Sequence, residues 1–322
     1  MRRRLLAFLV LPALLVGGLF LPLSPRGLVS HPHPARNYEE ALTRIAAIKS
    51  ADDARIAPEC RTTLYTYGSR TRHVVVLFHG LTNCPAQFDS LGHLVYARGA
   101  NVLIPRIPRH GFADRMTDQL AESDAREWCA FADSVVDAAR GLGDSVTVVG
   151  LSLGGTLAAW VAQERRDVDR AVLIAPMIGV AVAPGGWTPV VTRLAALLPN
   201  QFVWWNSRQR AALAGPKHVY PRFASRAVAA TLLIGGAILQ SAHERPPGAR
   251  RAAFITVGGD AAVDNGAIAE LARLWEKSRP GTVTERFEFP AERRLSHDVV
   301  DPDQVGGDPA FTYPVLERII GP

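Results

Sequence analysis

The sequence is poor in cysteine, in lysine and in charged residues generally, and it contains no internal repeat. Only 20% of its 322 residues are charged, whereas 48% are hydrophobic, which excludes a disordered or low-complexity chain. The three cysteines, Cys60, Cys84 and Cys129, are not spaced like the ligands of a metal site. The composition therefore predicts a globular protein with one large domain or two small ones.

The net positive charge of the chain comes from two short segments. The net charge is +6, and Arg2, Arg3 and Arg4 supply half of it. Residues 208–251 contain eight arginines and lysines but a single acidic residue, Glu244. The rest of the chain is therefore acidic, which argues against binding to nucleic acid.

The first 30 residues have the pattern of a membrane-targeting segment. An uncharged run rich in Leu, Val and Phe extends from residue 5 to residue 24, and about 20 apolar residues span a bilayer. No Ala-x-Ala site and no cysteine for lipid attachment follow it. We predict a signal anchor in the cell membrane, with the N-terminus cytoplasmic and the rest of the chain extracytoplasmic. A cleaved signal peptide and a secreted protein are the alternative, because hydropathy does not decide cleavage.

The cysteines of an exported chain meet an oxidising compartment, where one disulfide and one free thiol are expected. Cys60 and Cys84 flank a predicted pair of strands and are the preferred bridge. Three buried free thiols are the other interpretation.

The chain from residue 61 to residue 322 alternates between strand and helix patterns, after a linker and a short helix in residues 31–60. Strands are expected at 62–67, 73–78, 101–104, 145–149, 170–175, 252–257 and 284–289. Helices are expected at 37–50, 86–98, 124–140, 153–165, 267–277 and 314–319. Continuously apolar strands such as 74–78 are typical of a mostly parallel sheet with helices on both faces. Residues from about 178 to 250 interrupt the alternation and are predicted to form a cap insertion.

A Gly-x-Ser-x-Gly motif joins the strand at 145–149 to the helix that follows it. Gly150 and Gly154 flank Ser152 at what would be a sharp strand-to-helix turn, where neighbouring elements approach too closely for a Cβ atom. Such a turn exposes the serine hydroxyl above the sheet, next to a helix N-terminus that favours negative charge. The motif predicts that Ser152 is a nucleophile.

A nucleophilic serine needs a base and a carboxylate that orients the base. Asp260 follows the strand at 252–257 and is preferred as the acid, whereas Asp264 is expected to cap the next helix. Only three histidines follow Ser152, and His218 and His243 fall in the insertion. His297, after the last predicted strand, is therefore the predicted base.

The loop after the strand at 73–78 is the candidate oxyanion loop. His79 and Gly80 end the strand, and the loop can turn the N–H of Leu81 toward Ser152. The N–H of Leu153 would be the second donor. We expect His79 to hold this loop by hydrogen bonds and His110 to be structural.

The chain resembles the α/β-hydrolase superfamily, in particular bacterial carboxylesterases and monoacylglycerol lipases, through the segments His79-Gly80-Leu81-Thr82-Asn83, His110-Gly111, residues 150–155, Asp260-Ala-Ala-Val263 and the late His297. The likeness covers about residues 62–320. It implies an α/β-hydrolase fold, the triad Ser152, Asp260 and His297, and the oxyanion donors Leu81 and Leu153. No cofactor or metal is expected. The N-terminal segment, Cys84 and the insertion depart from the family pattern.

These features predict a serine hydrolase of small-molecule carboxylic esters, a class that includes lipids. A thioesterase or peptidase with the same triad, or a non-catalytic membrane-anchored binding module, are the alternatives. The apolar run at 228–239, with its basic flanks, is either a lipid-facing cap or a core-facing helix below a solvated basic face.

Overall fold

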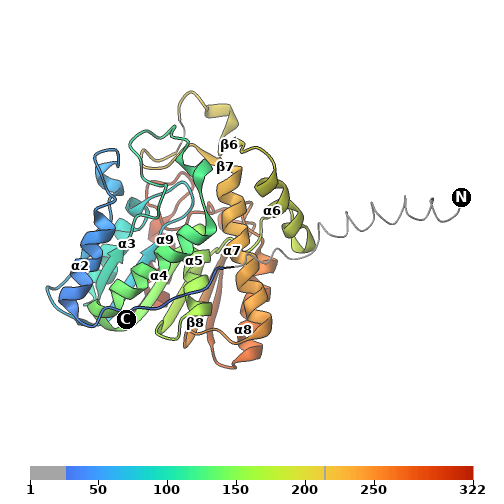
Figure 1. The fold of residues 1–322 in the computed structure, drawn as a ribbon. Helices are drawn as coiled ribbons and strands as arrows, with labels where there is room; N and C mark the ends of the chain where they lie inside the picture. Colours follow the sequence, from blue (N-terminus) through green and yellow to red (C-terminus); the bar gives the residue numbers. More distant parts are fainter. Residues whose placement is uncertain (1–26, 214, 322) are drawn as a thin grey trace, which may run out of the picture.

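The computed structural model describes residues 27–213 and 215–321 (Figure 1). The predicted membrane segment at residues 5–24 lies outside the described residues, so the anchor stays a prediction.

A seven-stranded sheet forms the centre of the molecule. Its strands lie in the order β1-β3-β2-β4-β5-β8-β9, and all neighbours are parallel except β1 and β3. The strands are β1 (Thr63–Tyr65), β2 (Thr71–Phe78), β3 (Asn101–Ile104), β4 (Gly143–Leu151), β5 (Arg170–Ile174), β8 (Arg251–Val257) and β9 (Val283–Phe289).

Helices cover both faces of this sheet because its central strands are apolar on both sides. Along β2, Val74, Val76 and Phe78 face one core, whereas Val75 and Leu77 face the other. The second core contains α3 (Asp89–Ala97) and α9 (Pro309–Ile320). The first core contains α2 (Tyr38–Lys49), α4 (Ala125–Leu142), α5 (Leu153–Glu164), α7 (Ser225–Glu244) and α8 (Asn265–Ser278). The predicted α/β fold with a mostly parallel sheet is confirmed.

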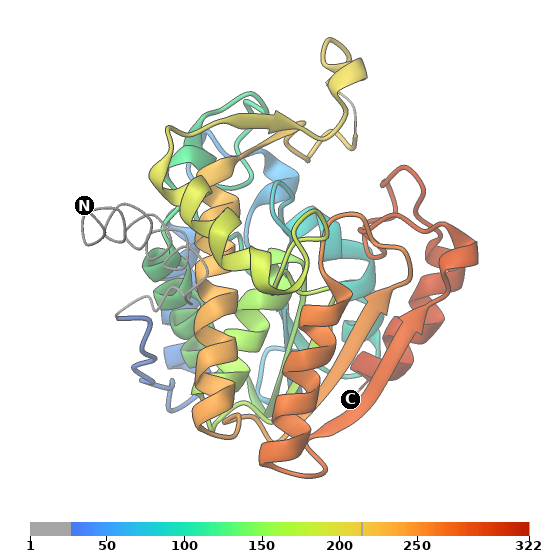
Figure 2. The ribbon, with the colours of Figure 1, turned by 90° about the vertical axis from the view of Figure 1, so that its right-hand side faces the viewer.

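The segment between β5 and β8 contains elements that the sequence pattern did not predict. These are α6 (Thr188–Leu197) and a small antiparallel sheet of β6 (Phe202–Trp204) and β7 (Arg222–Ala224). They lie above the sheet, whereas α7 runs down beside α8 (Figure 2).

Helix α7 belongs to the body of the domain. Among the described residues it alone is long and apolar enough to cross a membrane, but half of its apolar window is buried inside the protein. Its buried residues include Leu232, Ile234 and Ile238, which join the same core as α5. The run at 228–239 is therefore a core-facing helix.

The basic cluster at 208–251 is partly neutralised in space by acidic residues from distant parts of the chain. Three of its arginines form ion pairs across elements: Arg222 with Asp118 at 2.7 Å, Arg245 with Glu164 at 2.5 Å and Arg250 with Asp169 at 3.4 Å. The positive electrostatic potential at the surface of this segment is therefore smaller than its net charge alone would suggest.

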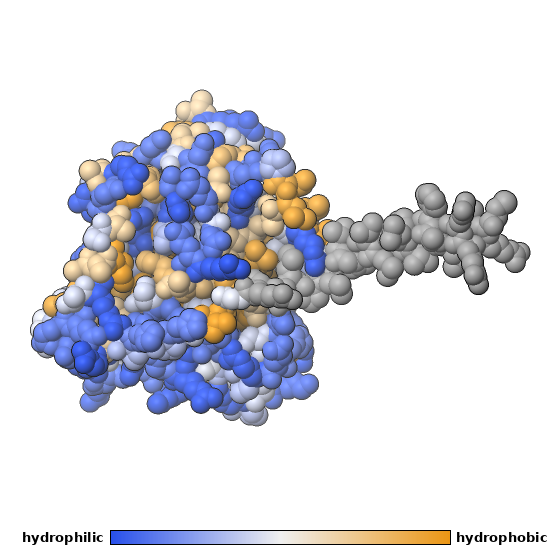
Figure 3. All heavy atoms as spheres, in the orientation of Figure 1, coloured by the Kyte–Doolittle hydropathy of each residue, from blue (hydrophilic) through white to orange (hydrophobic). Residues whose placement is uncertain are grey.

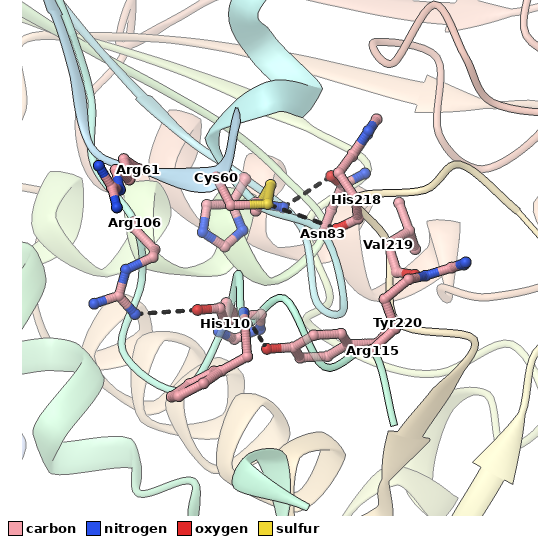
Figure 4. The surroundings of a disulfide bond; sticks show 12 residues. Cys60, Arg61, Asn83, Arg106, His110, Arg115, His218, Val219 and Tyr220 are labelled. Carbon is pink, nitrogen blue, oxygen red and sulfur yellow. Dashed lines mark hydrogen bonds between the residues drawn. A yellow bond between two sulfur atoms is a disulfide. The ribbon is translucent and has the colours of Figure 1, made fainter. Parts of the chain in front are cut away.

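Cys60 and Cys84 form a disulfide, and Cys129 is a buried free thiol. The preferred pairing is confirmed. The bridge ties the turn at Pro58–Cys60 to the loop that follows β2, and Asn83 and His218 lie close to it (Figure 4).

Removing this bridge is expected to lower the free energy of unfolding by about 3 kcal/mol, because it closes a loop with a sequence separation of 24. Urea denaturation of the wild type with and without reductant measures the loss. A Cys60→Ser/Cys84→Ser variant is the control, since reductant should leave its midpoint unchanged. Equal wild-type midpoints under both conditions would contradict the prediction.

Candidate active site

Ser152 occupies a strained turn between β4 and α5. Its φ of 57° and ψ of −117° lie outside the regions that most residues adopt. A Cβ atom on Gly150 would lie 2.1 Å from the carbonyl oxygen of Gly154, and one on Gly154 would lie 1.9 Å from that of Phe78. Both glycines are therefore required for the strand, the turn and the helix to approach this closely.

The three predicted catalytic side chains follow three strands of one sheet. Ser152 comes directly after β4, Asp260 shortly after β8, and His297 lies in the loop between β9 and α9. Because these strands are parallel, their carboxyl ends lie at the same edge of the sheet.

His297 and Asp260 are joined by a hydrogen bond. Nδ1 of His297 lies 2.6 Å from Oδ2 of Asp260, and the N–H of Ala262 donates to Oδ1 of Asp260 at 2.7 Å. Asp264 instead accepts a hydrogen bond from the N–H of Gly266 at the start of α8. The structure thus brings Asp260, and not Asp264, to the histidine.

The charge and hydrogen bonding around this pair favour an ionised Asp260. Burial raises the pKa of Asp260, but the hydrogen bond and charge of His297, with two backbone N–H groups, outweigh it and hold the pKa below its ordinary value. Since the carboxylate accepts from Nδ1, the other ring nitrogen carries the lone pair. That atom, Nε2, is buried and has no hydrogen-bond partner in the described part of the chain, Ser152 included.

The loop at residues 79–84, here called the oxyanion loop, is held from within by His79. The buried imidazole accepts a hydrogen bond from the N–H of Ile107 and donates to the carbonyl of Gly80, both at 3.0 Å. Burial lowers the pKa of His79 well below its usual value, so the ring is neutral. His110 is also buried, and burial lowers its pKa to about 4. These contacts agree with the loop-holding role expected of His79, and the burial of His110 agrees with the structural role expected of it.

The amides of Leu81 and Leu153 are free to donate. Leu153 is the first residue of α5, where an N–H group has no acceptor within the helix. Within residues 27–213 and 215–321, the N–H of Leu81 likewise has no hydrogen-bond acceptor. The structure therefore leaves both predicted oxyanion donors available.

Sequence reasoning missed a buried polar network behind the oxyanion loop. Gln87 accepts from the N–H of Gly80 at 2.7 Å and donates to Asp298 at 2.6 Å. Asn83 donates to Asp298 at 3.3 Å and to Asp301 at 3.1 Å. Burial and the charge of Asp301 raise the pKa of Asp298. The network connects the oxyanion loop to the loop of His297. The one sequence feature that could have predicted it is the position of Asp298, directly after His297.

The network extends to the insertion through His218, whose Nε2 lies 2.7 Å from Oδ2 of Asp301. A cavity of about 740 Å³ opens beside this pair, and neither Ser152 nor His297 lines it. In the described residues, no group of three or more His, Cys, Asp or Glu side chains could hold a metal ion.

Comparison with known proteins gives one family and several relatives. Residues 75–306 match the model of the alpha/beta hydrolase family. A thermostable monoacylglycerol lipase of Bacillus sp. (strain H-257) is 25% identical over 114 residues, which is 35% of this chain and 44% of the lipase. The aligned part thus spans less than half of that relative.

Solved structures of lipolytic enzymes share the fold. A metagenome-derived lipolytic enzyme superposes with a TM-score of 0.59 and 19% identity, over 82% of this chain and 98% of that one. The monoacylglycerol lipase of Paleococcus ferrophilus superposes with a TM-score of 0.59 and 15% identity, over 80% of this chain and 97% of that one. A soluble variant of the Saccharomyces cerevisiae monoglyceride lipase superposes with a TM-score of 0.59 and 15% identity, over 81% of this chain and 90% of that one.

Proposed function

Because this chain belongs to the alpha/beta hydrolase family and is similar over part of its length to a monoacylglycerol lipase, we propose that it hydrolyses carboxylic esters through an acyl-enzyme formed on Ser152. The observation that carries the proposal is the 2.6 Å hydrogen bond between His297 and Asp260, which leaves the buried Nε2 of His297 as a base.

Each predicted residue takes part in this reaction. The Ser152 hydroxyl attacks the acyl carbonyl while Nε2 of His297 takes its proton, and Asp260 stabilises the imidazolium. The N–H groups of Leu81 and Leu153 stabilise the negative charge on the carbonyl oxygen. The alcohol leaves with the proton that His297 returns. A water molecule, activated by the same nitrogen, then hydrolyses the acyl-enzyme.

The surface of the insertion supports a lipid acyl ester as the substrate. Its exposed apolar side chains include Val182, Trp187, Leu194, Leu197, Leu198, Val203 and Trp205. The surface around α6 is accordingly hydrophobic (Figure 3). Residues 170–243 contain no aspartate or glutamate, so nothing acidic in this segment repels an anionic headgroup.

The proposal extends to location. A signal anchor in residues 1–30 would hold the enzyme on the extracytoplasmic side of the cell membrane, close to lipid substrates. The Cys60–Cys84 disulfide supports an oxidising compartment of this kind.

Hydrolysis of p-nitrophenyl esters by the full chain in detergent tests the substrate class. We expect kcat/KM to rise from acetate through butyrate to long-chain esters, because a longer acyl chain buries more apolar surface. The Ser152→Ala variant supplies the background rate. A preference for acetate would contradict the lipid substrate, and hydrolysis confined to thioesters or peptides would replace the proposed function with one of its alternatives.

A further inference from the structure

The insertion holds the oxyanion loop at Thr82, the residue after the predicted donor Leu81. The backbone N–H of Tyr220 donates to the carbonyl of Thr82 at 2.9 Å. The indole Nε1–H of Trp205 donates to Oγ1 of Thr82 at 3.0 Å. Both bonds cross more than 100 residues of sequence. They join the loop after β2 to residues next to the strand pair β6–β7, because Trp205 directly follows β6 and Tyr220 lies two residues before β7.

Thr82 needs such external support. Its φ of 69° lies in the left-handed region, which a β-branched residue adopts only at a cost in energy. Thr82 is also 3% exposed, so water does not readily replace a lost partner of its hydroxyl group. The bonds from Trp205 and Tyr220 therefore help to keep the loop in a conformation that its own sequence disfavours.

The amide of Leu81 is consequently fixed from both sides. On one side, Gln87 accepts from the N–H of Gly80 at 2.7 Å. On the other side, the insertion binds the side chain and the carbonyl of Thr82. An oxyanion donor is effective only when it is held in place before the reaction begins.

Trp205 joins this loop to the surface of the insertion. Its ring packs against Phe223 of β7, with centroids 4.5 Å apart, yet 49% of the residue is exposed among the apolar side chains of the insertion. Tyr220 follows His218 and Val219, and its ring points toward His110, with the ring centroids 6.5 Å apart (Figure 4).

We propose that Trp205 is a positioning residue of the oxyanion hole, through which the insertion sets the orientation of the Leu81 amide. This inference rests on the proposed ester hydrolysis and assigns the insertion a part in the chemistry itself. A shift of the Trp205 side chain would therefore change the rate of acyl transfer, and not the affinity for substrate.

Trp205→Phe tests the proposal, because phenylalanine keeps the packing on Phe223 and removes only the N–H donor. We expect kcat to fall roughly 10-fold, less than the loss of a direct oxyanion donor, with KM within about 2-fold. Trp204→Phe is the matched control: Trp204 neighbours Trp205, its ring lies 5.6 Å from Arg210, and kcat should stay at the wild-type value.

A second variant and a second substrate separate positioning from a general structural role. Thr82→Val removes the acceptor of the same hydrogen bond, so its loss and that of Trp205→Phe should not add in the double variant. Thionoesters place sulfur, a weak hydrogen-bond acceptor, in the oxyanion hole. Both variants should therefore lose more activity on an oxoester than on its thionoester.

Two results would overturn the inference while the proposed function stands: equal kcat in Trp205→Phe and Trp204→Phe, or equal losses on oxoester and thionoester. If Trp205→Phe fails to fold, Thr82→Val gives the same comparison. A folded wild-type chain that hydrolyses no ester would instead overturn the proposed function, and this inference with it.

Discussion

Ser152→Ala is expected to lower ester hydrolysis by a factor on the order of 10⁴ or more, and to abolish labelling by a fluorophosphonate probe. Alanine removes the only atom that forms the acyl-enzyme. The Ser152 hydroxyl makes no hydrogen bond within the described part of the chain, so the variant should unfold at the wild-type temperature. Initial rates, probe labelling and thermal unfolding measure the three expectations.

Ser134→Ala is the matched control for this experiment. Ser134 is an exposed serine of α4 whose hydroxyl donates to the carbonyl of Phe131, and its loss should leave both rate and labelling intact. Undiminished labelling of the Ser152→Ala variant would show that another nucleophile reacts, and the proposed acyl-enzyme would be wrong.

Asp260→Asn is expected to lower kcat by about 10⁴. The amide of asparagine can donate to Nδ1 of His297, which would stabilise the tautomer that has its proton on Nε2 and cannot accept one from Ser152. Asp264→Asn should have a small effect, since Asp264 accepts from the N–H of Gly266 and an asparagine can do the same. A larger loss from Asp264→Asn would overturn the assignment of the acid.

The stability of the same two variants is expected to depend differently on pH. The pKa of Asp260 in the folded chain is below the ordinary value of 3.8. Its ionised form therefore stabilises the fold above pH 3.8, and this contribution is lost as the pH falls through the lowered pKa. Urea midpoints measured between about pH 5 and pH 2 should fall less steeply in Asp260→Asn than in Asp264→Asn.

The α/β body could be predicted from the sequence because each of its elements has a local signal. The strands at 101–104 and 145–149 are short apolar runs, and the helix after Ser152 begins at a motif that only a sharp turn explains. The same local signals predicted Ser152, Asp260 and His297 as the candidate triad, since each follows a recognisable strand.

The insertion could not be predicted in this way. Strands β6 and β7 have three residues each and lie 17 residues apart, so neither shows a clear alternation. The ion pairs of Arg222, Arg245 and Arg250 depend on where the end of α5 and the loops that contain Asp118 and Asp169 lie in space. The hydrogen bond from Trp205 to Thr82 joins residues 123 positions apart, and no local sequence pattern predicts such a contact.

The burial of α7 sets a limit on exchanging substrate specificity between relatives. Although α7 lies within the same insertion as α6, it supplies the outer layer over α5, the helix that begins directly after Ser152. Replacing the whole insertion with that of a relative would remove α7, and with it the residues that pack over α5. A graft that starts at α6 and ends at β7 would exchange the apolar surface and keep the scaffold, and the donor segment would have to bring its own partner for Thr82.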